Sequence, residues 1–323
     1  MNDKMAEKPR AIDCIVCGEI CVDLPVSTVD RSRPLIELPI GHVDPILPGS
    51  GGIVANSGMA MTRLGLRTSA FGCVGDDLWG RFLRERLAEE GVETSHLVTM
   101  KGRPSSVTVV VGGDDGEHTF LFHAGASQRF NRSMIEQKLE VFKECQYALF
   151  GYYALMPALE NELSDVFRQL QGTGCQIAMD TAGGGGSMTP LNRILPHVNI
   201  YIPSLIEAQS QTKQRDPRSM IEFYRRYAPN ALLGIKLGNQ GAILSPADGE
   251  WIHIDPVTPP GVVIDTTGAG DCFYAGLITG LVRGRSIEES GRLAAAAGAC
   301  SVTQTGAVNG LGDLTSLLQL AHA

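Results

Sequence analysis

The chain has 323 residues, of which 43% are apolar and 19% are charged, and its formal net charge at pH 7 is −8. This composition excludes disorder for most of the chain, and it suffices for one large α/β domain or two smaller ones. The acidic balance argues against nucleic acid or a membrane surface as a partner, since both require a basic face. The sequence has no apolar run of the roughly 18 residues that a membrane span needs, and no apolar leader at its N-terminus. We therefore expect a cytoplasmic protein.

Short β-branched apolar runs alternate with amphipathic stretches along the chain. This pattern is typical of a parallel sheet covered by helices. We expect strands at residues 12–18, 68–72, 146–151, 175–180, 198–203, 231–237 and 241–245. We expect helices at residues 54–64, 78–90, 158–171, 218–227, 270–282 and 288–304.

The segment of the first predicted strand contains closely spaced cysteines, Cys14, Cys17 and Cys21, a spacing that invites a metal site. In a strand, Cys14 and Cys17 would point to opposite faces of the sheet, which opposes chelation of one ion. Eight cysteines in a chain of this length without a leader are more typical of reduced thiols than of a disulfide framework. We expect the three to be plain core cysteines.

Two β-rich segments, residues 24–48 and 104–124, interrupt the alternation of strands and helices. The GGDDG sequence at 112–116 is typical of a hairpin tip. Together the two segments would form a small sheet above the strand ends. Ligands of an α/β sheet bind outside the carboxyl ends of its strands, so such a sheet would act as a lid. We therefore predict one domain over residues 1–323 with this lid.

Glycine is over-represented, with 38 residues in the chain, and several glycines are clustered. At the start of segment 51–65, Gly51 and Gly52 would let a substrate approach the backbone, and Asn56 offers a donor and acceptors to a polyol. A loop followed by a capped helix would explain this segment equally well. The GGGG sequence at 183–186 is more typical of a flexible loop than of a phosphate cradle.

The sequence DTTGAGDCFYAG at 265–276 lies between an apolar run and a helical run. Gly268, Ala269 and Gly270 would begin the helix and present backbone N–H groups and the positive end of its dipole to an anion. Asp271 follows them and is well placed to take a proton from a hydroxyl group that attacks a bound phosphoryl group. A glycine-rich turn with a capping aspartate would explain the same residues without a ligand.

These two segments resemble the signatures of the ribokinase-like (PfkB) carbohydrate kinases. The N-terminal signature has a Gly-Gly pair, an Asn a few residues on and an Arg-Leu-Gly close, as in GGIVANSGMAMTRLG at 51–65. The C-terminal signature, D-T-x-G-A-G-D-x-F-x-x-G, is matched at 265–276. Further matches lie at 71–97, 236–242 and 302–307, in the right order over nearly the whole chain.

The resemblance implies a three-layer α/β/α domain with a mainly parallel central sheet and a small β-sheet lid, through which many relatives form homodimers. It implies transfer of the γ-phosphoryl group of ATP to a primary hydroxyl of a sugar or sugar acid of the ribose, fructose or ketodeoxygluconate type. By motif match, Asp271 would be the catalytic base, and Gly268, Ala269 and Gly270 would form the anion hole. The residues that would orient the sugar are Asp23, which we place at the end of the first strand, Gly51, Gly52 and Asn56.

The resemblance also implies a nucleotide site. Gly238 and Gly241 match a turn that lets ATP lie against the backbone, and Thr267 would contribute beside the anion hole. Lys236 directly precedes this turn region, where relatives often have Thr. A charge near the phosphates and an exposed lysine at a strand end are equally good explanations of Lys236.

Two metal sites follow from the resemblance as well. Relatives hold a monovalent cation where Asp265 and Thr267 lie, which implies activation by potassium. The family often has an N-x-x-E motif linked to Mg²⁺ and phosphate, whereas this chain has Ser204 in place of Asn, followed by Glu207. Glu207 can still order water bound to Mg²⁺, so Mg²⁺ dependence is expected.

Two other functions stay open. A nucleoside kinase of the adenosine or inosine type would need apolar or aromatic contacts from the lid, where Phe120 and Phe122 lie. A sugar-binding sensor without catalysis would keep the fold, but it has no need of a base at Asp271. A dinucleotide-dependent dehydrogenase is disfavoured, because the first strand runs into GEICVD and no G-x-G-x-x-G fingerprint follows it.

Overall fold

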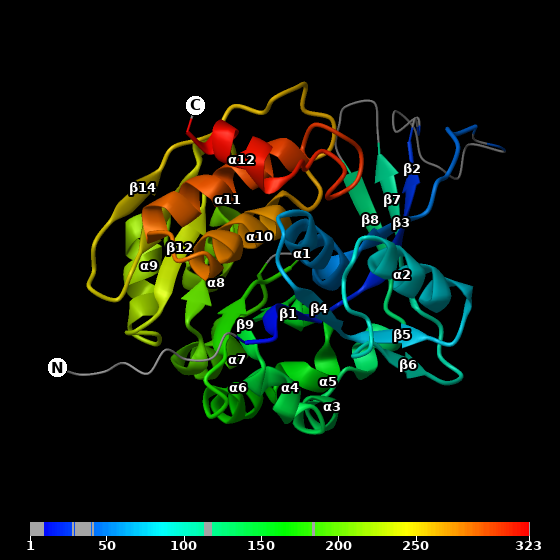
Figure 1. Cartoon of the computed structure of the whole chain (residues 1–323), viewed down its shortest axis with the longest axis horizontal. Helices are drawn as coiled ribbons and strands as arrows, with labels where there is room; N and C mark the ends of the chain where they lie inside the picture. The colour runs from blue at the N-terminus through cyan, green and yellow to red at the C-terminus, as the bar shows by residue number, and fades with distance from the viewer. Residues whose placement is uncertain are drawn as a thin grey trace.

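The computed structural model describes residues 10–27, 29, 40, 42–112, 118–182 and 185–322 (Figure 1). Most of the predicted hairpin tip, residues 113–116, and the first half of the glycine run, residues 183–184, lie outside this part. Within it, no helix is both long and apolar enough to cross a bilayer.

Among the described residues, eight strands form the central sheet, in the order β14-β13-β12-β11-β10-β9-β1-β4. Each neighbouring pair from β12 to β4 is parallel, and β13 and β14 add an antiparallel edge. The strands are β1 (Ile12–Gly18), β4 (Thr68–Phe71), β9 (Cys145–Gly151), β10 (Gln176–Met179), β11 (Ile200–Tyr201), β12 (Leu232–Lys236), β13 (Ala242–Ser245) and β14 (Ile252–Ile254). The predicted mainly parallel central sheet is confirmed.

Helices cover both faces of this sheet and give three layers (Figure 1). One buried core contains residues of α1 (Gly52–Arg63), α2 (Leu78–Glu89), α10 (Ala269–Val282), α11 (Ile287–Ser301) and α12 (Leu314–Ala321). The other contains residues of α3 (Arg132–Glu136), α4 (Leu139–Lys143), α5 (Pro157–Glu160), α6 (Leu163–Gln171), α7 (Met188–Ile194), α8 (Leu205–Thr212) and α9 (Pro217–Arg225). In β9, Leu149 packs into the first core and Phe150 into the second, as expected for a strand buried on both faces. The α/β/α fold is therefore confirmed.

The cysteines of the first strand follow the same alternation. Cys14 lies in one core and Cys17 in the other. All eight cysteines are free and buried, and no group of three or more His, Cys, Asp or Glu within the described ranges is arranged to hold a metal ion. Burial also raises the pKa of the Cys14 and Cys17 thiols well above their ordinary value, so they stay protonated. The prediction of plain core cysteines is confirmed.

A second, smaller sheet lies beside α1 and α2 (Figure 1). It has the order β3-β2-β7-β8, with strands β2 (Cys21–Val26), β3 (Gly49–Gly51), β7 (Ser106–Gly112) and β8 (His118–His123). We call it the second sheet. Its first strand begins at Cys21, before the segment at 24–48 that we predicted to supply it. The prediction that Asp23 ends the first strand is wrong, because β1 ends at Gly18. Asp23 belongs to β2, where it pairs with Thr108 of β7.

Shorter elements complete the chain. A two-stranded sheet joins β5 (Cys73–Gly75) and β6 (Val98–Met100), and 3₁₀ helices form at η2 (Ala126–Arg129), η3 (Tyr153–Leu155), η4 (Leu195–His197) and η5 (Gly238–Gln240). The helix predicted at 158–171 is divided into α5 and α6. A turn separates them, in which the Glu162 N–H donates to the Leu159 carbonyl. Leu159 and Leu163 are both buried, so the apolar spacing continues across the turn and hides it from the sequence.

Candidate functional site

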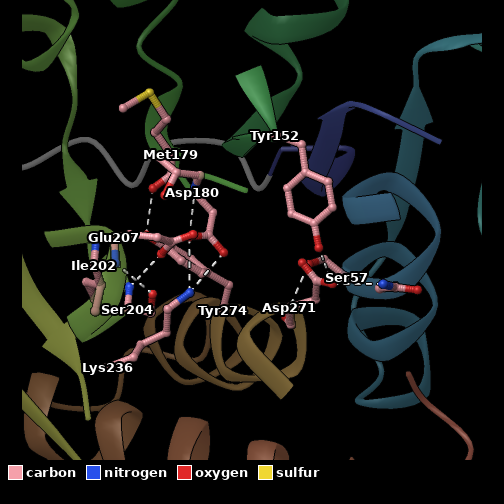
Figure 2. Close-up of polar contacts among 12 residues, drawn as sticks. Ser57, Tyr152, Met179, Asp180, Ile202, Ser204, Glu207, Lys236, Asp271 and Tyr274 are labelled. Atoms are coloured by element: carbon pink, nitrogen blue, oxygen red, sulfur yellow. Dashed lines mark hydrogen bonds and ion pairs between the residues drawn. The ribbon is translucent and has the colours of Figure 1, made fainter. Parts of the chain in front are cut away.

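Helix starts and strand ends meet at the carboxyl edge of the central sheet. Helices α1, α8 and α10 begin near the ends of β9, β10 and β12. Side-chain contacts, described below, connect these helix starts to the strand ends. In an α/β sheet this edge is where ligands bind. Figure 2 shows polar side chains there in two neighbouring groups, one around Asp271 and one around Lys236.

Asp271 lies in the first turn of α10, and only 2% of its surface is exposed. Its Oδ2 atom accepts hydrogen bonds from Asn56 Nδ2 and from the Tyr152 hydroxyl, both at 2.8 Å (Figure 2). Ser57 Oγ donates to the backbone carbonyl of Asp271 at 3.1 Å. Asp271 Oδ1 is buried and has no hydrogen-bond partner. The fold thus brings the two predicted residues Asn56 and Asp271 into direct contact and leaves one carboxylate oxygen unused.

Burial raises the pKa of Asp271 above its ordinary value, because the carboxylate loses its hydration. The hydrogen bonds from Asn56 and Tyr152 and the positive charge of Lys236 act in the opposite direction. A raised pKa makes the ionised carboxylate a stronger base, and Oδ1 has free lone pairs. This carboxylate can act as a general base toward a hydroxyl group.

The start of α10 has the features of an anion-binding site. Gly268 is the N-cap with φ of 76°, and Ala269 and Gly270 are the first helical residues. No side chain fits at Gly268, because a Cβ atom there would lie 2.2 Å from the Ala307 Cβ. The N–H groups of a first helical turn lack partners inside the helix and carry positive partial charge. The Ala269 N–H is already partly used, since it donates to the Thr266 carbonyl at 3.3 Å.

Lys236, at the end of β12, lies beside this helix start. A Cβ atom on Gly270 would lie 3.1 Å from Lys236 Nζ, and Nζ is 4.9 Å from the centre of the Tyr274 ring. Nζ donates to both carboxylate oxygens of Asp180 at 3.0 Å (Figure 2). Burial lowers the pKa of Lys236, but the carboxylates of Asp180 and Glu207 more than offset this, so the pKa is raised. With 12% of its side-chain surface exposed, Lys236 is not a surface lysine.

Two more carboxyl groups lie against the start of α1. A Cβ atom on Gly51 would lie 2.1 Å from Asp23 Oδ2, so a side chain there would displace the Asp23 carboxylate. Gly52 requires glycine, because its φ is 79° and a Cβ atom there would lie 2.6 Å from the Glu19 carbonyl oxygen. Burial raises the pKa of Asp23 to about 6. Burial, helped by the nearby Asp23, raises the pKa of Glu19 to about 8. Glu19 Oε1 and Asn56 Oδ1 are buried and have no hydrogen-bond partner.

Ser204 and Glu207 form the start of α8. Ser204 Oγ accepts from the Glu207 N–H at 3.3 Å, and Glu207 Oε2 accepts from the Ser204 N–H at 2.7 Å, which is a capping box. Serine therefore has a structural use where the signature has Asn. Glu207 raises the pKa values of both Lys236 and Asp180, so its charge is close to theirs. The Glu207 carboxylate fits a Mg²⁺ ion that is bound mostly by phosphate and water oxygens, and Glu207 would contact the ion through one of these water molecules.

The predicted nucleotide turn has two different glycines. Gly238, with φ of 62°, has open space where a Cβ atom would be. Gly241, with φ of 83°, packs so closely that a Cβ atom would lie 2.0 Å from the Ile254 carbonyl oxygen. Contact with β14 is thus sufficient to require glycine at 241, whereas Gly238 is free to face a ligand.

Asp265 connects two loops that follow the central sheet. Its Oδ1 accepts from the Thr267 N–H at 2.9 Å and its Oδ2 from the Gly306 N–H at 2.8 Å. Both oxygens keep a lone pair, so Asp265 still fits as one ligand of a monovalent cation. Its evident contribution is to fix the loop that leads into α10.

The sequence model of the pfkB family carbohydrate kinases matches residues 14–313. This chain belongs to that family. A ribokinase of Arabidopsis thaliana is 27% identical to this kinase over an alignment of 334 residues, gaps included, which covers 99% of this chain and 83% of the relative. An aminoimidazole riboside kinase of Salmonella typhimurium is 30% identical over 280 residues, which cover 81% of this chain and 84% of the relative. A solved structure of the Arabidopsis thaliana ribokinase complexed with ribose and ATP has a TM-score of 0.84 and 24% identity, and covers 97% of this chain and 99% of that chain.

Membership of the family makes the chain a carbohydrate kinase, a phosphotransferase with an alcohol group as acceptor. The relatives act on sugars and on a riboside, so the kinase belongs to the sugar and nucleoside kinases. The solved ribokinase shares its fold over nearly the whole length of both chains.

Sequence reasoning missed three residues that the structure places in the candidate site: Glu19, Tyr152 and Asp180. All three are polar residues at the carboxyl end of a predicted strand, since the strands were expected at 12–18, 146–151 and 175–180. Because the carboxyl ends of parallel strands meet at one edge, such residues are candidates for the site whenever the sheet is predicted. The position at a predicted strand end is therefore the sequence signal that marks all three.

Proposed function

We propose that this kinase transfers the γ-phosphoryl group of ATP to a primary hydroxyl group of a neutral sugar. The observation that carries the proposal is the unpartnered Asp271 Oδ1, buried on the helix whose first turn lies beside Lys236. A base, an anion-binding helix start and a cation are the groups that phosphoryl transfer to an alcohol needs. ATP as the donor is supported by the similar ribokinase that was solved with ribose and ATP.

In the proposed reaction, Asp271 Oδ1 accepts the proton of the substrate hydroxyl group while the hydroxyl oxygen attacks the γ-phosphorus. The bond from this phosphorus to the oxygen that bridges to the β-phosphate breaks, and ADP leaves with the electron pair. The N–H groups at Gly268–Gly270 and the Lys236 ammonium would stabilise the charge on the transferred group. Mg²⁺, held by phosphate oxygens, water and Glu207, would add positive charge at the phosphates. Asp271 then releases its proton to water.

A polyol with uncharged hydroxyl groups fits the acceptor side best. Glu19 Oε1, Asn56 Oδ1 and Asp271 Oδ1 are buried acceptors without donors, and hydroxyl groups can supply donors to them. The charges of Asp23 and Asp271 both help to raise the pKa of Glu19, and that of Asp271 also helps to raise the pKa of Asp23. A carboxylate on the substrate would add a negative charge beside Asp23 and Asp271, which disfavours a sugar acid.

A riboside kinase is the second candidate, because two observations favour it. One is the relative named aminoimidazole riboside kinase. The other is the register of the second sheet, in which Asp23 pairs with Thr108 and Thr108 with Phe122. Paired residues of neighbouring strands share a face, so Phe122 lies on the face of Asp23, where an aromatic ring can stack on a base.

A substrate panel tests the proposal. Purified kinase is assayed by coupled ADP release with ribose, fructose, ketodeoxygluconate, adenosine and inosine. We expect the highest kcat/KM with ribose or fructose and the lowest with ketodeoxygluconate. A higher value with adenosine or inosine would favour the riboside candidate, and a higher value with the sugar acid would contradict the proposal.

The role of Asp271 is tested with Asp271→Asn. We expect the rate of turnover to fall by at least about a hundredfold, because the base is lost. Sugar and ATP binding by calorimetry should persist, since the amide keeps the shape of the side chain. Asp248→Asn, on an exposed loop, is the matched control and should keep full activity. Near-normal turnover in Asp271→Asn would contradict the assignment, and binding without ADP formation in the unaltered protein would favour a sensor.

We also propose activation by potassium, with Asp265 and Thr267 near the cation, and a homodimer formed through the second sheet, which would act as the lid over the sugar. Replacement of potassium by sodium in the assay tests the first of these. Equal rates in both salts would contradict it.

A further inference from the structure

Tyr152 connects the end of β9 to the carboxylate of Asp271. It directly follows Gly151, the last residue of a strand in the middle of the central sheet. Its hydroxyl donates to Asp271 Oδ2 at 2.8 Å, and Figure 2 shows its ring extending from the sheet toward the start of α10. The two residues are 119 positions apart in the sequence, so only the folded chain brings them together.

The backbone of Tyr152 is in the left-handed region, with φ of 61° and ψ of 34°. This conformation is uncommon for any residue but glycine and is unfavourable for a bulky side chain. Such a residue persists when the contacts around it compensate, and these residues are concentrated at functional sites. The Tyr152 carbonyl accepts from the Leu155 N–H at 2.8 Å, and the ring packs against the core that contains α1 and α10. The chain therefore holds an unfavourable conformation that aims the hydroxyl at Asp271.

The hydrogen bonds divide the two oxygens of the Asp271 carboxylate between two tasks. Oδ2 accepts from both Asn56 Nδ2 and Tyr152, whereas Oδ1 accepts from no group. The two donors come from different elements, α1 and the end of β9, and together they restrain the carboxylate and with it the direction of Oδ1. A donor also favours the ionised form of a carboxyl group, which burial disfavours.

We propose that Tyr152 is a positioning residue for the general base of this kinase: its hydroxyl orients Asp271 and keeps it ionised. The inference rests on the proposed function, since it assumes that Asp271 takes the proton of the acceptor. Tyr152 itself remains a donor, because burial and the nearby Asp271 keep its pKa well above the ordinary value. It does not touch the reacting atoms and acts only through Asp271.

The first test compares Tyr152→Phe with Tyr153→Phe. Tyr153 is the adjacent residue and is fully buried, and its hydroxyl donates to the Gly185 carbonyl at 3.4 Å rather than to Asp271. We expect kcat of Tyr152→Phe to fall about tenfold to a hundredfold, the value of one hydrogen bond to a charged group, with little change in the KM of the sugar. Tyr153→Phe should keep its kcat. Unchanged kcat in Tyr152→Phe, or equal losses in both variants, would overturn the proposal.

The pH profile separates positioning from a general packing effect. Without the Tyr152 donor the pKa of Asp271 rises, so the acid limb of kcat/KM should move to higher pH by about one unit in Tyr152→Phe. The other charged groups near Asp271 stay the same in this variant. They are Lys236 of β12, Glu207 of α8, Asp23 of β2, Asp180 at the end of β10 and Glu19 at the end of β1. An acid limb that does not move would overturn the proposal.

A titration without substrate separates this inference from the proposed function. The ¹³C carboxyl signal of Asp271 is identified by its loss in Asp271→Asn, and its pKa is then measured in the unaltered protein and in Tyr152→Phe. A higher pKa in Tyr152→Phe supports the role of Tyr152 even if no compound of the panel is phosphorylated, in which case the proposed function alone fails. Equal pKa values would overturn the inference even in an active kinase.

A double variant asks whether Tyr152 acts only through Asp271. In the Asp271→Asn background, Tyr152→Phe should cause no further loss of the residual rate, because the base that it serves is already absent. Losses that multiply in the double variant would show an independent role and overturn the proposal.

Discussion

Single residues at the acceptor side of the site are carboxyl groups held away from water. Glu19 is 1% exposed, and burial raises its pKa from the ordinary 4.5 to about 8. Between these values the folded kinase binds a proton at Glu19 that the unfolded chain releases. The free energy of unfolding therefore falls as pH rises through this window. The same carboxyl group that offers hydrogen bonds to a substrate makes the folded protein less stable in mild alkali.

The variant Glu19→Gln tests whether Glu19 causes this loss of stability at raised pH. The amide does not titrate, so the variant should gain stability relative to the unaltered protein between pH 5 and pH 8, by roughly 1–4 kcal/mol. Urea unfolding at both pH values measures the difference. Glu85→Gln, on the exposed face of α2, is the matched control and should show the same pH dependence as the unaltered protein. If Glu19→Gln also showed that same dependence, Glu19 would be ionised throughout the range.

At the scale of elements, one buried ion pair joins the ends of β10 and β12 beside the first turn of α10. Lys236 extends from β12 to Asp180 at the end of β10, and its Nζ lies next to the first turn of α10. Side-chain exposure is 12% for Lys236 and 3% for Asp180, so neither charge is well hydrated. An ion pair of this kind contributes little net stability as a pair, but loss of one partner leaves a buried charge alone.

Lys236→Met is expected to lower the free energy of unfolding by about 3–5 kcal/mol at pH 9, because Asp180 is left without its cation. Burial raises the pKa of Asp180 to about 7 even beside Lys236, so protonation of Asp180 relieves this loss, which should shrink at pH 6. Lys236→Met combined with Asp180→Asn should recover part of the stability but not the affinity for ATP. Lys143→Met, which removes the exposed partner of Glu140 on α4, should cost under about 1 kcal/mol. Equal losses at positions 236 and 143 would show that the Lys236 pair is hydrated in solution.

The elements differ in how well the sequence foretells them, and the reasons are local. Strands such as β1 and β12 are apolar runs buried on both faces, so their position is evident. Helix α8 is missed because its sequence, LIEAQSQT, has little apolar periodicity; it is begun instead by the capping box of Ser204 and Glu207. Strand β14 has only three residues at the sheet edge and gives no pattern.

In the candidate site, too, some features can be predicted from the sequence and others cannot. The two signatures indicate Asn56 and Asp271 separately, but their contact depends on how α1 packs on α10, which no local pattern contains. The left-handed backbone of Tyr152 has no sequence signal either, because the surrounding fold imposes it against the preference of the residue. Residues that a signature or a strand end marks can be predicted, whereas contacts between distant segments require the fold.

At the scale of the whole molecule, the second sheet carries exposed apolar side chains. Phe120 and Leu121 on its edge strand β8 are 55% and 57% exposed, and Ile46 and Leu47, which precede β3, are 46% and 72% exposed. An edge strand also presents unpaired N–H and C=O groups. Apolar side chains on and beside an edge strand favour pairing with a second copy of the chain.

Sedimentation at micromolar concentration should therefore give twice the mass of one chain, and Leu121→Arg should give the mass of one chain. Ile206→Arg, at a 73% exposed position on α8, is the matched control and should remain a dimer. Because β8 carries Phe122 on the face of Asp23, we expect the monomeric variant to show a raised KM for the acceptor and a nearly unchanged KM for ATP. A single-chain mass for the unaltered protein would contradict the dimer, and the second sheet would then close over the acceptor without a partner.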